Sequence, residues 1–535
     1  MKLTSSEIEK KRSENIQEIS SRHFDALVVG GGINGAVSAL ALRSRGVNVA
    51  LFEKNDFASG VSQESSNLVW GGFKYLESYE LKLVMGLCHS RNRLARAYPS
   101  RLVEKRFLAA LDSSSPFAPW FAALGANAYW GIGQFATKRP RYRSPRTIKR
   151  LEPSVRADNL IGGIEYSDHL IVENDSRFVI QMIVDAADRG ASVGNYMTVL
   201  EADYFKKRWH LKVKDEIVDR EFETTSDVLV NTAGPQVSEI CSMSNTKTES
   251  NLVFSKGVHL IVPRVTDSGR ILAFFDETKR LFYVIPMGEC SVIGTTDERV
   301  KEHEVSVSSD DIDFLLKEAN AKLSLPKPLN AEDVIAQRVG VRPLVIPKGG
   351  VDQDKDWTEL SRRHEVETNR RYRMISVLGG KLSDCLNVGE EVVSSLEDLG
   401  YKTSKPTNRW YGEPSDAEKS IFFHAAKKNG IEEDAIKELW RRHGSRSFDV
   451  LENISNDPRT AEKLSENIDY CLAEISVMKK YEFIYDSEDL LRRRTLIGQT
   501  VPQSQLEKDP GFAAPVSYTH LRAHETRHDL VCRLL

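Results

Sequence analysis

The stretch DALVVGGGINGAVSALALRSRGVNVALFEK (residues 25–54) decides the fold. An apolar segment, 26–29, leads into three glycines spaced G-x-G-x-x-G, and a helix-like segment through Arg45 follows. A second apolar segment, 47–52, ends in Glu53. This order of strand, glycine turn, helix, strand and acid is that of a Rossmann mononucleotide unit. We therefore predict an α/β fold that begins with a dinucleotide-binding turn.

Each part of this segment has a chemical purpose. The three glycines, Gly30, Gly32 and Gly35, let the chain turn tightly and bring the N-terminus of a helix against a pyrophosphate. Glu53 ends the second strand, where its carboxylate accepts hydrogen bonds from ribose hydroxyls. An acid at this position opposes a 2′-phosphate, so NADP is disfavoured. The motif suits NAD and FAD equally.

Three later segments favour FAD. The loop at 55–77 is rich in small and hydroxyl residues, which can line an extended cofactor and donate hydrogen bonds to it. The stretch 226–237 is a strand with a small-residue turn, and 373–396 is a strand, a diglycine and a helix. The N-terminus of that helix would stabilise negative charge on a reduced flavin. The candidate cofactor-binding residues in these segments are Ser59, Ser62, Ser66, Gly71, Gly72, Gly234, Gly379, Gly380 and Lys381.

The composition argues against several other classes of protein. A chain of 535 residues with a formal net charge of −3 gives no electrostatic case for nucleic-acid binding. Its six cysteines are scattered without metal-like spacing, so we predict no metal site and a reducing, intracellular compartment. Residues 1–24 are too charged for the apolar core of a signal peptide, and we expect a solvated helix there.

The uncharged stretch 113–137 raises the question of a membrane. Two prolines and three glycines argue against a spanning helix. Aromatic residues beside a basic run at 138–146 suit a patch that lies in the membrane interface. The aromatic residues expected to insert are Trp120, Phe121, Tyr129 and Trp130. A buried helix pair in a cap domain is the alternative, and the sequence favours neither.

These segments, in this order, resemble the FAD-dependent glycerol-3-phosphate dehydrogenases of the aerobic, membrane-associated type. The resemblance extends from about residue 24 to about residue 499 of this divergent member. Where the family has SSKLIHGGLRYLE, this chain has SSNLVWGGFKYLE (65–77), so that Asn67, Trp70 and Lys74 replace a lysine, a histidine and an arginine. Other matching motifs are EKNDFASGVS (53–62), GTTD (294–297), GVRPL (340–344), GGKL (379–382), LWRRHGSR (439–446) and YEFIYDSEDLLRRRTLIG (481–498).

The resemblance implies a reaction and a set of site residues. The expected reaction is oxidation of sn-glycerol 3-phosphate to dihydroxyacetone phosphate, with electrons passed from FAD to a membrane quinone. His259 is the expected base because an imidazole can receive the hydroxyl proton near neutral pH; a structural histidine is the alternative. The other catalytic residues that the resemblance implies are Lys74, Tyr75, Arg342, Arg362 and Lys381.

The cations among these residues imply a small anionic substrate. Arg342 and Arg362 match family positions that contact the substrate, and arginine forks suit phosphate oxygens. A solvated Arg362–Arg363 pair on a loop is the alternative for the second of them. The resemblance places the protein in the cytoplasm, peripheral on the inner face of the cell membrane, with the membrane surface and a quinone as partners.

The expected architecture is an FAD-binding, Rossmann-type flavoprotein with two dinucleotide-binding-domain halves, a mixed-sheet substrate domain and a C-terminal helical domain. The oxidoreductase region is 20–400 and the helical domain is 405–500. Within the region, the FAD-binding parts are 20–100, 150–250 and 335–400, and the substrate or cap parts are 101–149 and 250–335.

Two other functions stay open. One is an FAD oxidoreductase that acts on another small anionic hydroxy or amino acid, with oxygen as a potential acceptor. The other is a flavin-binding protein without turnover. Neither the electron acceptor nor the oligomeric state follows from the sequence. Residues 515–535 are predicted not to belong to the natural protein, because a transposase adapter used in sequencing libraries can encode their first part.

Overall fold

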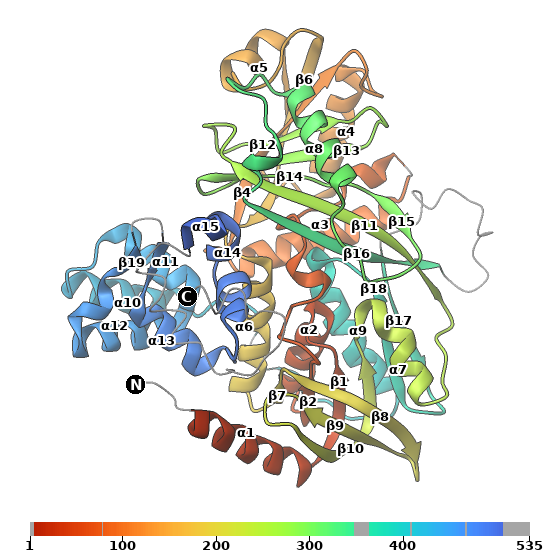
Figure 1. Cartoon of the computed structure of the whole chain (residues 1–535). Coiled ribbons are helices and arrows are strands. Elements are labelled where there is room, and N and C mark those ends of the chain that lie inside the picture. The colour runs from red at the N-terminus through yellow and green to blue at the C-terminus, as the bar shows by residue number, and fades with distance from the viewer. Residues whose placement is uncertain (1–4, 78, 347–362, 407–408, 466–467, 507–535) are drawn as a thin grey trace.

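The structure is a computed structural model that describes residues 5–77, 79–346, 363–406, 409–465 and 468–506. Two β-sheets occupy the lower and upper parts of Figure 1, and helices from the C-terminal part of the chain lie beside them. One sheet has a parallel centre flanked by helices, and the other is mixed. The predicted fold class is therefore confirmed.

The lower, eight-stranded sheet carries the Rossmann unit. Its strand order is β17-β18-β10-β1-β2-β7, with β9 and then β8 continuing from β10. Neighbouring strands from β18 to β7 run parallel, whereas β17 pairs antiparallel at the edge. The strands are β1 His23–Val29, β2 Val49–Phe52, β7 Ser192–Gly194, β8 Met197–Phe205, β9 Arg208–Asp215, β10 Arg220–Asn231, β17 His364–Asn369 and β18 Met374–Gly379.

Helices cover both faces of this sheet, which is why its central strands are apolar throughout. Helices α2, α6 and α9 share one hydrophobic core with one face, and α1 packs against the other face. The predicted N-terminal helix is present as α1, but it is not solvated on every side, because Ile16 and Ile19 are fully buried. The bounds are α1 Ser5–Ser20, α2 Ile33–Arg43, α6 Asp175–Asp188 and α9 Cys385–Asp398.

The upper, ten-stranded sheet has the order β15-β11-β14-β13-β12-β4-β6-β3, with β16 paired to β11 and β5 paired to β6. Only β12 and β4 pair in parallel among its described strand pairs. The strands are β3 Leu68–Val69, β4 Leu102–Asp112, β5 Arg141–Arg143, β6 Leu160–Ile171, β11 Asn251–Pro263, β12 Ile271–Phe275, β13 Leu281–Met287, β14 Cys290–Gly294, β15 Glu298–Val300 and β16 Ala336–Ile346.

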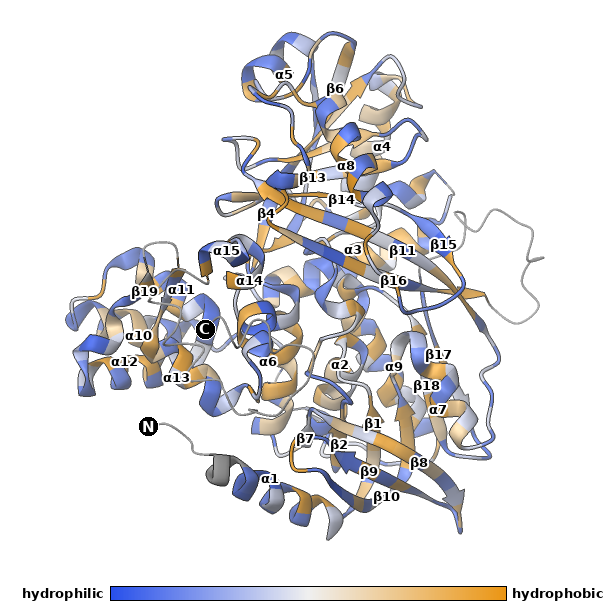
Figure 2. Ribbon diagram, in the orientation of Figure 1, coloured by the Kyte–Doolittle hydropathy of each residue, from blue (hydrophilic) through white to orange (hydrophobic). Residues whose placement is uncertain are grey.

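The sheets divide the chain differently from the predicted boundaries. Strands β6 and β16 lie in parts expected to bind FAD, yet both belong to the upper sheet. Strand β4, expected in a cap, is an interior strand of that sheet. Figure 2 shows hydrophobic residues along the strands of both sheets and the helices beside them. Pairing with distant strands decides this membership, and such pairing leaves no local signal in the sequence.

The C-terminal part is helical, as predicted, and it packs against α6. Its core contains Phe422 and Trp440. Arg177 of α6 donates two hydrogen bonds to the carboxylate of Glu482, each at 2.9 Å. The elements are α10 Asp416–Lys428, α11 Glu433–His443, α12 Ser447–Asn456, β19 Lys463–Ser465, β20 Ile468–Cys471, α13 Leu472–Tyr481, α14 Ile497–Thr500 and α15 Gln503–Leu506.

The uncharged stretch contains one helix, α4 (Pro119–Ile132), instead of a pair. Trp120 is 70% exposed and Phe121 is 49% exposed. Tyr129 was predicted to insert into a membrane, but it is buried and donates a hydrogen bond to Asp168 at 2.8 Å. Trp130 is half-buried and donates to a backbone carbonyl. Within the described residues, no helix is both long and apolar enough to cross a membrane.

Candidate active site

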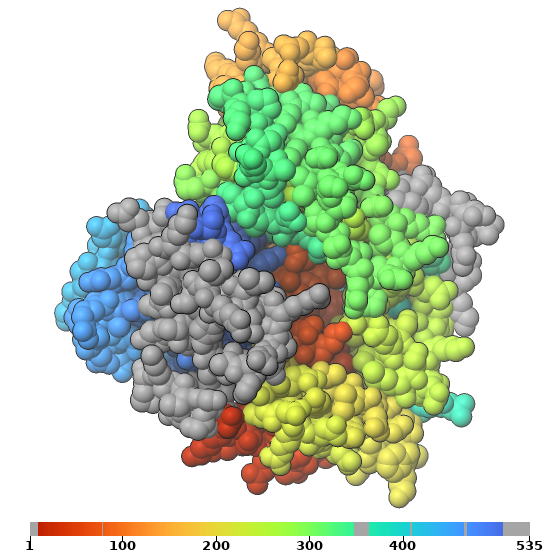
Figure 3. All heavy atoms as spheres, in the orientation of Figure 1, coloured from red at the N-terminus to blue at the C-terminus, as the bar shows by residue number. Residues whose placement is uncertain are grey.

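Four loops gather at one edge of the lower sheet. Strands β1, β2, β10 and β18 run parallel, so the loops that follow them leave from the same edge. In open α/β sheets, ligands bind at this carboxyl edge. The space-filling view in Figure 3 shows red and orange atoms of the first part of the chain between the green and yellow parts of the surface.

The glycine turn after β1 allows no larger side chain at two positions. Gly30 has a φ of +108°, and a Cβ there would lie 2.5 Å from the carbonyl oxygen of Thr232. A Cβ on Gly35 would lie 1.8 Å from the carbonyl oxygen of Gly30. Gly32 is the N-cap of α2, and the Ile33 N–H donates to the Ser62 hydroxyl at 3.0 Å. The turn therefore packs the start of α2 directly against the ends of β1 and β10.

Glu53 stands at the end of β2 beside this turn. Its carboxylate accepts hydrogen bonds from the N–H groups of Gly31, at 2.7 Å, and Asn55, at 3.0 Å. Desolvation raises the pKa of Glu53 even though both amides favour the charged form. The two amides fix the carboxylate where a ribose would meet it.

The loops leave room and unused polar atoms for a dinucleotide. A Cβ on Gly60 or on Gly234, which has a φ of +59°, would meet no atom within 4 Å. Helix α2 has no acidic residue in its first turn, so its N-terminus favours an anion. Asn34 Oδ1 is buried without a hydrogen-bond partner among the described residues, and its Nδ2 donates to the Gly379 carbonyl at 3.0 Å. These features fit FAD.

The diglycine at 71–72 has a reason other than the expected contact with a flavin. A Cβ on Gly71 would lie 2.3 Å from the Tyr129 hydroxyl and 2.6 Å from the Cys88 sulfur. Gly72 has a φ of +84°, which favours glycine. Packing against other side chains and a left-handed turn therefore require glycine at both positions, and contact of their backbone with a flavin stays a prediction.

Strands β11 and β16 of the upper sheet carry the second group of site residues. In their antiparallel pairing, His259 lies opposite Arg338, Gly257 opposite Gly340 and Ser255 opposite Arg342. Directly opposite residues in such a pair project from the same face. The glycine pair adds no side chain of its own between His259 and Arg342, and neighbouring side chains lie over it: a Cβ on Gly340 would lie 2.9 Å from the Glu64 Cβ. A Cβ on Gly257 would lie 2.1 Å from the Arg342 guanidinium, so that guanidinium extends across the glycine.

The GTTD motif holds Arg342 in place. Its guanidinium donates to Thr295 Oγ1 at 2.6 Å, to the Thr296 carbonyl at 3.3 Å and to the Asp297 carboxylate at 3.2 Å. The motif therefore fixes the direction of the fork, as an anion site requires.

His259 is buried, with 3% of its surface exposed. Neither ring nitrogen has a hydrogen-bond partner among the described residues. Burial, together with the cations Arg338 and Arg342, lowers the pKa of His259 well below its ordinary value. The imidazole is thus neutral near pH 7 and able to accept a proton from a group placed against it.

Lys381 and Tyr75 lie together, as expected for residues of one site. The Lys381 ammonium lies 4.0 Å from the centre of the Tyr75 ring and 5.5 Å from that of Trp70. Trp70 and Tyr75 are 6.0 Å apart between ring centres. Lys74 precedes Tyr75 and is half-buried. Arg362 lies outside the described residues, and its neighbour Arg363 is exposed and pairs with Glu365 at 3.0 Å.

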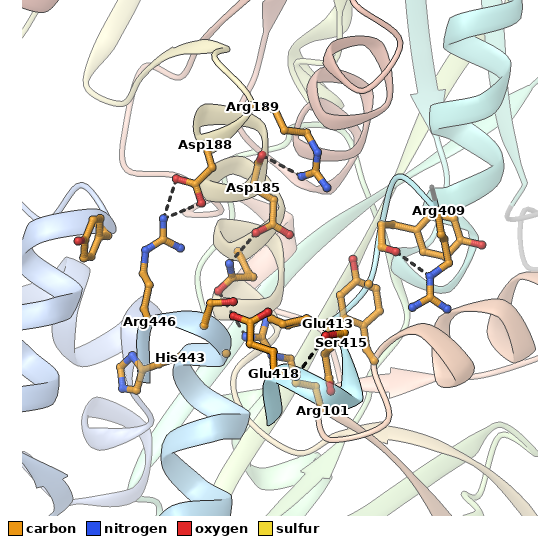
Figure 4. A pocket seen from close by; sticks show the side chains of 18 of the residues that line it. Arg101, Asp185, Asp188, Arg189, Arg409, Glu413, Ser415, Glu418, His443 and Arg446 are labelled. Atoms are coloured by element: carbon orange, nitrogen blue, oxygen red, sulfur yellow. Dashed lines mark hydrogen bonds and ion pairs between the residues drawn. The ribbon is translucent and has the colours of Figure 1, made fainter. Parts of the chain in front are cut away.

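A large cavity lies elsewhere, between α6, the segment before α10 and the C-terminal helices. It measures about 840 Å³ and contains none of the predicted site residues. Figure 4 shows arginines and acids around it, with Arg446 facing Asp188. These two residues form an ion pair at 2.7 Å. This cavity separates two packed parts of the chain and is not the candidate active site.

Sequence reasoning missed two residues that shape the site. Thr232 donates from its hydroxyl to the Val29 carbonyl at 2.8 Å and so joins β10 to the glycine turn. Arg338 lies opposite His259, but nothing in the matched motifs includes it. Its signal was the spacing of four residues to Arg342, which puts both side chains on one face of a strand.

Comparisons with known proteins agree with this geometry. A family model for FAD dependent oxidoreductase matches residues 25–360, and one for the C-terminal domain of alpha-glycerophosphate oxidase matches 409–517. The chain is 28% identical over 509 residues to the aerobic glycerol-3-phosphate dehydrogenase of Bacillus subtilis, covering 91% of this chain and 89% of the relative. It is 29% identical over 526 residues to the glycerol-3-phosphate dehydrogenase of Synechocystis, covering 94% and 92%.

Solved structures show the same fold. The glycerol-3-phosphate dehydrogenase from Bacillus halodurans complexed with FAD matches with a TM-score of 0.73 at 24% identity, covering 98% of this chain and 96% of that one. The FAD-bound L-alpha-glycerophosphate oxidase from Mycoplasma pneumoniae matches with a TM-score of 0.56 at 15% identity, covering 74% and 100%. The family match confirms the predicted cofactor, FAD. By its glycine turn, its fold and a family match over more than half of its length, this chain is a member of the FAD-dependent oxidoreductase family.

Proposed function

We propose that this enzyme oxidises sn-glycerol 3-phosphate to dihydroxyacetone phosphate. One observation carries the proposal: a neutral, buried His259 shares a strand face with Arg342, and two glycines separate them. A base at one end and an anion-binding fork at the other suit an alcohol that bears a phosphate. The names of the relatives from Bacillus subtilis and Synechocystis support the same substrate.

The residues of this chain divide the reaction between them. His259 receives the hydroxyl proton on a ring nitrogen, and FAD, when bound, accepts the hydride. Arg342 binds the phosphate, and Lys74, Tyr75, Arg362 and Lys381 complete the surroundings of the substrate. The phosphate also offsets the positive charge near His259, which raises the affinity of the imidazole for a proton when the substrate is in place.

The residues at the edge of the lower sheet would hold FAD. The N-terminus of α2 would bind the pyrophosphate, and Glu53 would accept hydrogen bonds from the ribose. The remaining residues that we assign to the cofactor are Gly30, Gly32, Gly35, Ser59, Ser62, Ser66, Gly71, Gly72, Gly234, Gly379, Gly380 and Lys381. Quantifying dihydroxyacetone phosphate against reduced flavin tests the proposal, and one product per flavin is expected.

Arg342→Gln is expected to raise the KM for glycerol 3-phosphate by about 10- to 100-fold and to change kcat little. A hydrogen bond to a charged group contributes about 1.5–3 kcal/mol, and this contribution is made before and after hydride transfer alike. Steady-state kinetics with an artificial electron acceptor measures the change. Arg370→Gln is the matched control, because Arg370 is 70% exposed and lies at the far end of β17. An unchanged KM in the first variant would remove Arg342 from the phosphate site.

The proposed electron acceptor is a membrane quinone. Reduced enzyme mixed with a water-soluble quinone should reoxidise faster than reduced enzyme mixed with air, and without forming hydrogen peroxide. Stoichiometric peroxide with slow quinone reduction would instead assign oxygen as the acceptor.

The surface around α4 supports attachment to the inner face of the cell membrane. Trp120, Phe121 and Leu124 of this helix are exposed, as is Phe135 just after it. A second cavity of about 380 Å³ adjoins the basic run, with six cations around one buried acid. Its residues are Arg106, Lys138, Arg139, Arg141, Arg143, Glu165 and Arg270. Exposed aromatics beside a cationic surface suit anionic lipid headgroups.

Serine at both Trp120 and Phe121 is expected to weaken binding to anionic vesicles at least about tenfold, since burying one large apolar side chain contributes about 1.5–3 kcal/mol. Flotation with vesicles measures this effect, and the flavin content should not change. Serine at Phe205 and Ile421 is the control, because both are exposed but lie on β8 and α10. If the unmodified protein does not float with anionic vesicles, the surface has another role.

A further inference from the structure

Arg338 carries a buried positive charge, and none of its hydrogen-bond partners in the described part of the chain is a carboxylate. It is 1% exposed, and its guanidinium donates to the Ser65 carbonyl at 2.6 Å, to Asn67 Oδ1 at 2.5 Å and to Gln499 Oε1 at 2.8 Å. Burial lowers the pKa of Arg338 to about 10, so the group remains charged at neutral pH. The nearby carboxylates of Asp175 and Glu64 favour its charge and partly offset the cost of burial. A buried cation whose hydrogen-bond acceptors are neutral still costs free energy, and such groups gather at functional sites.

Two of these partners, Ser65 and Asn67, begin the SSNLVWGG loop that leads to Trp70 and Tyr75. Asn67 has a φ of +58°, and its side-chain amide donates to the Glu173 carbonyl at 2.9 Å. Its own carbonyl accepts from the Ile171 N–H at 2.8 Å. The residue is therefore fixed on several sides, and its remaining side-chain oxygen is committed to Arg338.

Position 67 is also where this chain departs from the motif that it resembles. The motif has lysine there, and this chain has asparagine, which carries no charge. The guanidinium of Arg338, entering from β16, reaches that asparagine. One cation is thus present at the same place, supplied by a different strand.

We propose that Arg338 supplies the positive charge that the motif carries at position 67, and that it is a positioning residue for the flavin-facing loop and for His259. Arg338 lies directly opposite His259 in the β11–β16 pair. It orients the loop through Ser65 and Asn67, and Gln499 anchors it to the C-terminal module. The proposal rests on the proposed function, in which His259 accepts the substrate proton.

Among the described residues, the two cations that lower the pKa of His259 both come from β16. Arg338 and Arg342 of β16 both oppose its protonation, and Asp297 partly offsets Arg342 at 3.2 Å. On the other side of β11, the residue paired with His259 is Gly294 of β14, which has no side chain. Removing the Arg338 charge should therefore make His259 easier to protonate.

The experiment moves the cation between the two positions. The variants are Arg338→Gln, Asn67→Lys, and the double variant that carries both changes. Arg338→Gln is expected to shift the acid limb of the kcat/KM profile to higher pH by about one unit, a tenfold change in proton affinity. It should also slow flavin reduction about tenfold at neutral pH. Asn67→Lys alone places two cations together and should lose activity to a similar extent.

The double variant decides the proposal. It is expected to regain flavin reduction to within about threefold of the unmodified enzyme, and to return the acid limb toward its original pH. The proposal is overturned if the losses in the rate of flavin reduction caused by the two single changes simply add in the double variant, because additivity is the behaviour of independent positions. If Arg338→Gln does not fold, Arg338→Lys keeps the charge, and an acid limb unchanged in that variant supports the proposal while a displaced limb contradicts it.

A second readout separates this proposal from the proposed function. The absorbance spectrum of oxidised, FAD-loaded protein can be titrated with pH without any substrate. Arg338→Gln should move the midpoint of the spectral change to higher pH, and the double variant should return the midpoint to its original pH. If glycerol 3-phosphate fails to reduce the unmodified enzyme, the proposed function fails, yet this titration still tests the placement of the charge.

Discussion

His259→Gln is expected to slow reduction of the bound flavin by glycerol 3-phosphate by about 10²–10⁴-fold, the usual contribution of a positioned base. Glutamine fills similar space and keeps polar atoms, but it cannot take up a proton. Stopped-flow absorbance under anaerobic conditions measures the rate at saturating substrate. The amount of bound FAD should stay unchanged, since His259 lies on β11 and not in the loops after β1, β2 or β10.

The pH profile gives an independent check on His259. Burial and two nearby cations lower the pKa of His259, so the acid limb of kcat/KM should lie below pH 6.5 in the unmodified enzyme. This limb should disappear in His259→Gln. His210→Gln is the control, because that ring stacks on Phe205 at 3.9 Å in the β8–β9 hairpin. Flavin reduction at the unmodified rate in His259→Gln would make His259 a structural residue.

Gly35→Ala is expected to yield protein that retains almost no FAD. The added Cβ would lie 1.8 Å from the Gly30 carbonyl oxygen and 2.8 Å from Thr232 Oγ1. The first of these is a backbone atom, so the turn itself must move away from the start of α2. That movement withdraws the helix N-terminus from the pyrophosphate. The ratio of flavin to protein absorbance after gel filtration measures the loss.

Gly86→Ala provides the matched control for this substitution. Gly86 lies inside α3 (Leu81–Ala97), and a Cβ there would meet no atom within 4 Å. Alanine is favoured over glycine in a helix interior by about 1 kcal/mol, so the control should keep its FAD and gain stability. Full flavin content in Gly35→Ala would show that the turn after β1 does not hold the cofactor.

The glycine turn and the strand–helix–strand unit around it could be predicted because their signal is local. Gly30, Gly32, Gly35 and Glu53 all lie within one strand–helix–strand unit, and their spacing alone specifies the geometry. His259 and Arg342 are different. Their residue types and spacing do not mark them as a site, and only resemblance to a family assigned them a role. The structure adds that they share one strand face across a glycine pair.

The errors came from contacts between segments far apart in the chain. The sequence around Tyr129 predicts an aromatic residue in the membrane interface. In the structure its hydroxyl is hydrogen-bonded to Asp168 and Arg91, which come from other segments. In the sequence, nothing distinguishes Arg338 from an ordinary strand residue. Its distinguishing feature is the hydrogen bond to Asn67, which lies 271 positions away in the sequence. Tertiary contacts of this kind leave no pattern that composition or periodicity can detect.

The most direct test of the central claim is anaerobic mixing of the oxidised, FAD-loaded protein with glycerol 3-phosphate or with glycerol. A site with a neutral base at one end and an anion-binding fork at the other predicts rapid, complete bleaching of the flavin by glycerol 3-phosphate. Glycerol at the same concentration should bleach it at least about a hundredfold more slowly, since it lacks two or more charge-assisted hydrogen bonds. Equal rates with both compounds, or no bleaching by glycerol 3-phosphate, would contradict the account.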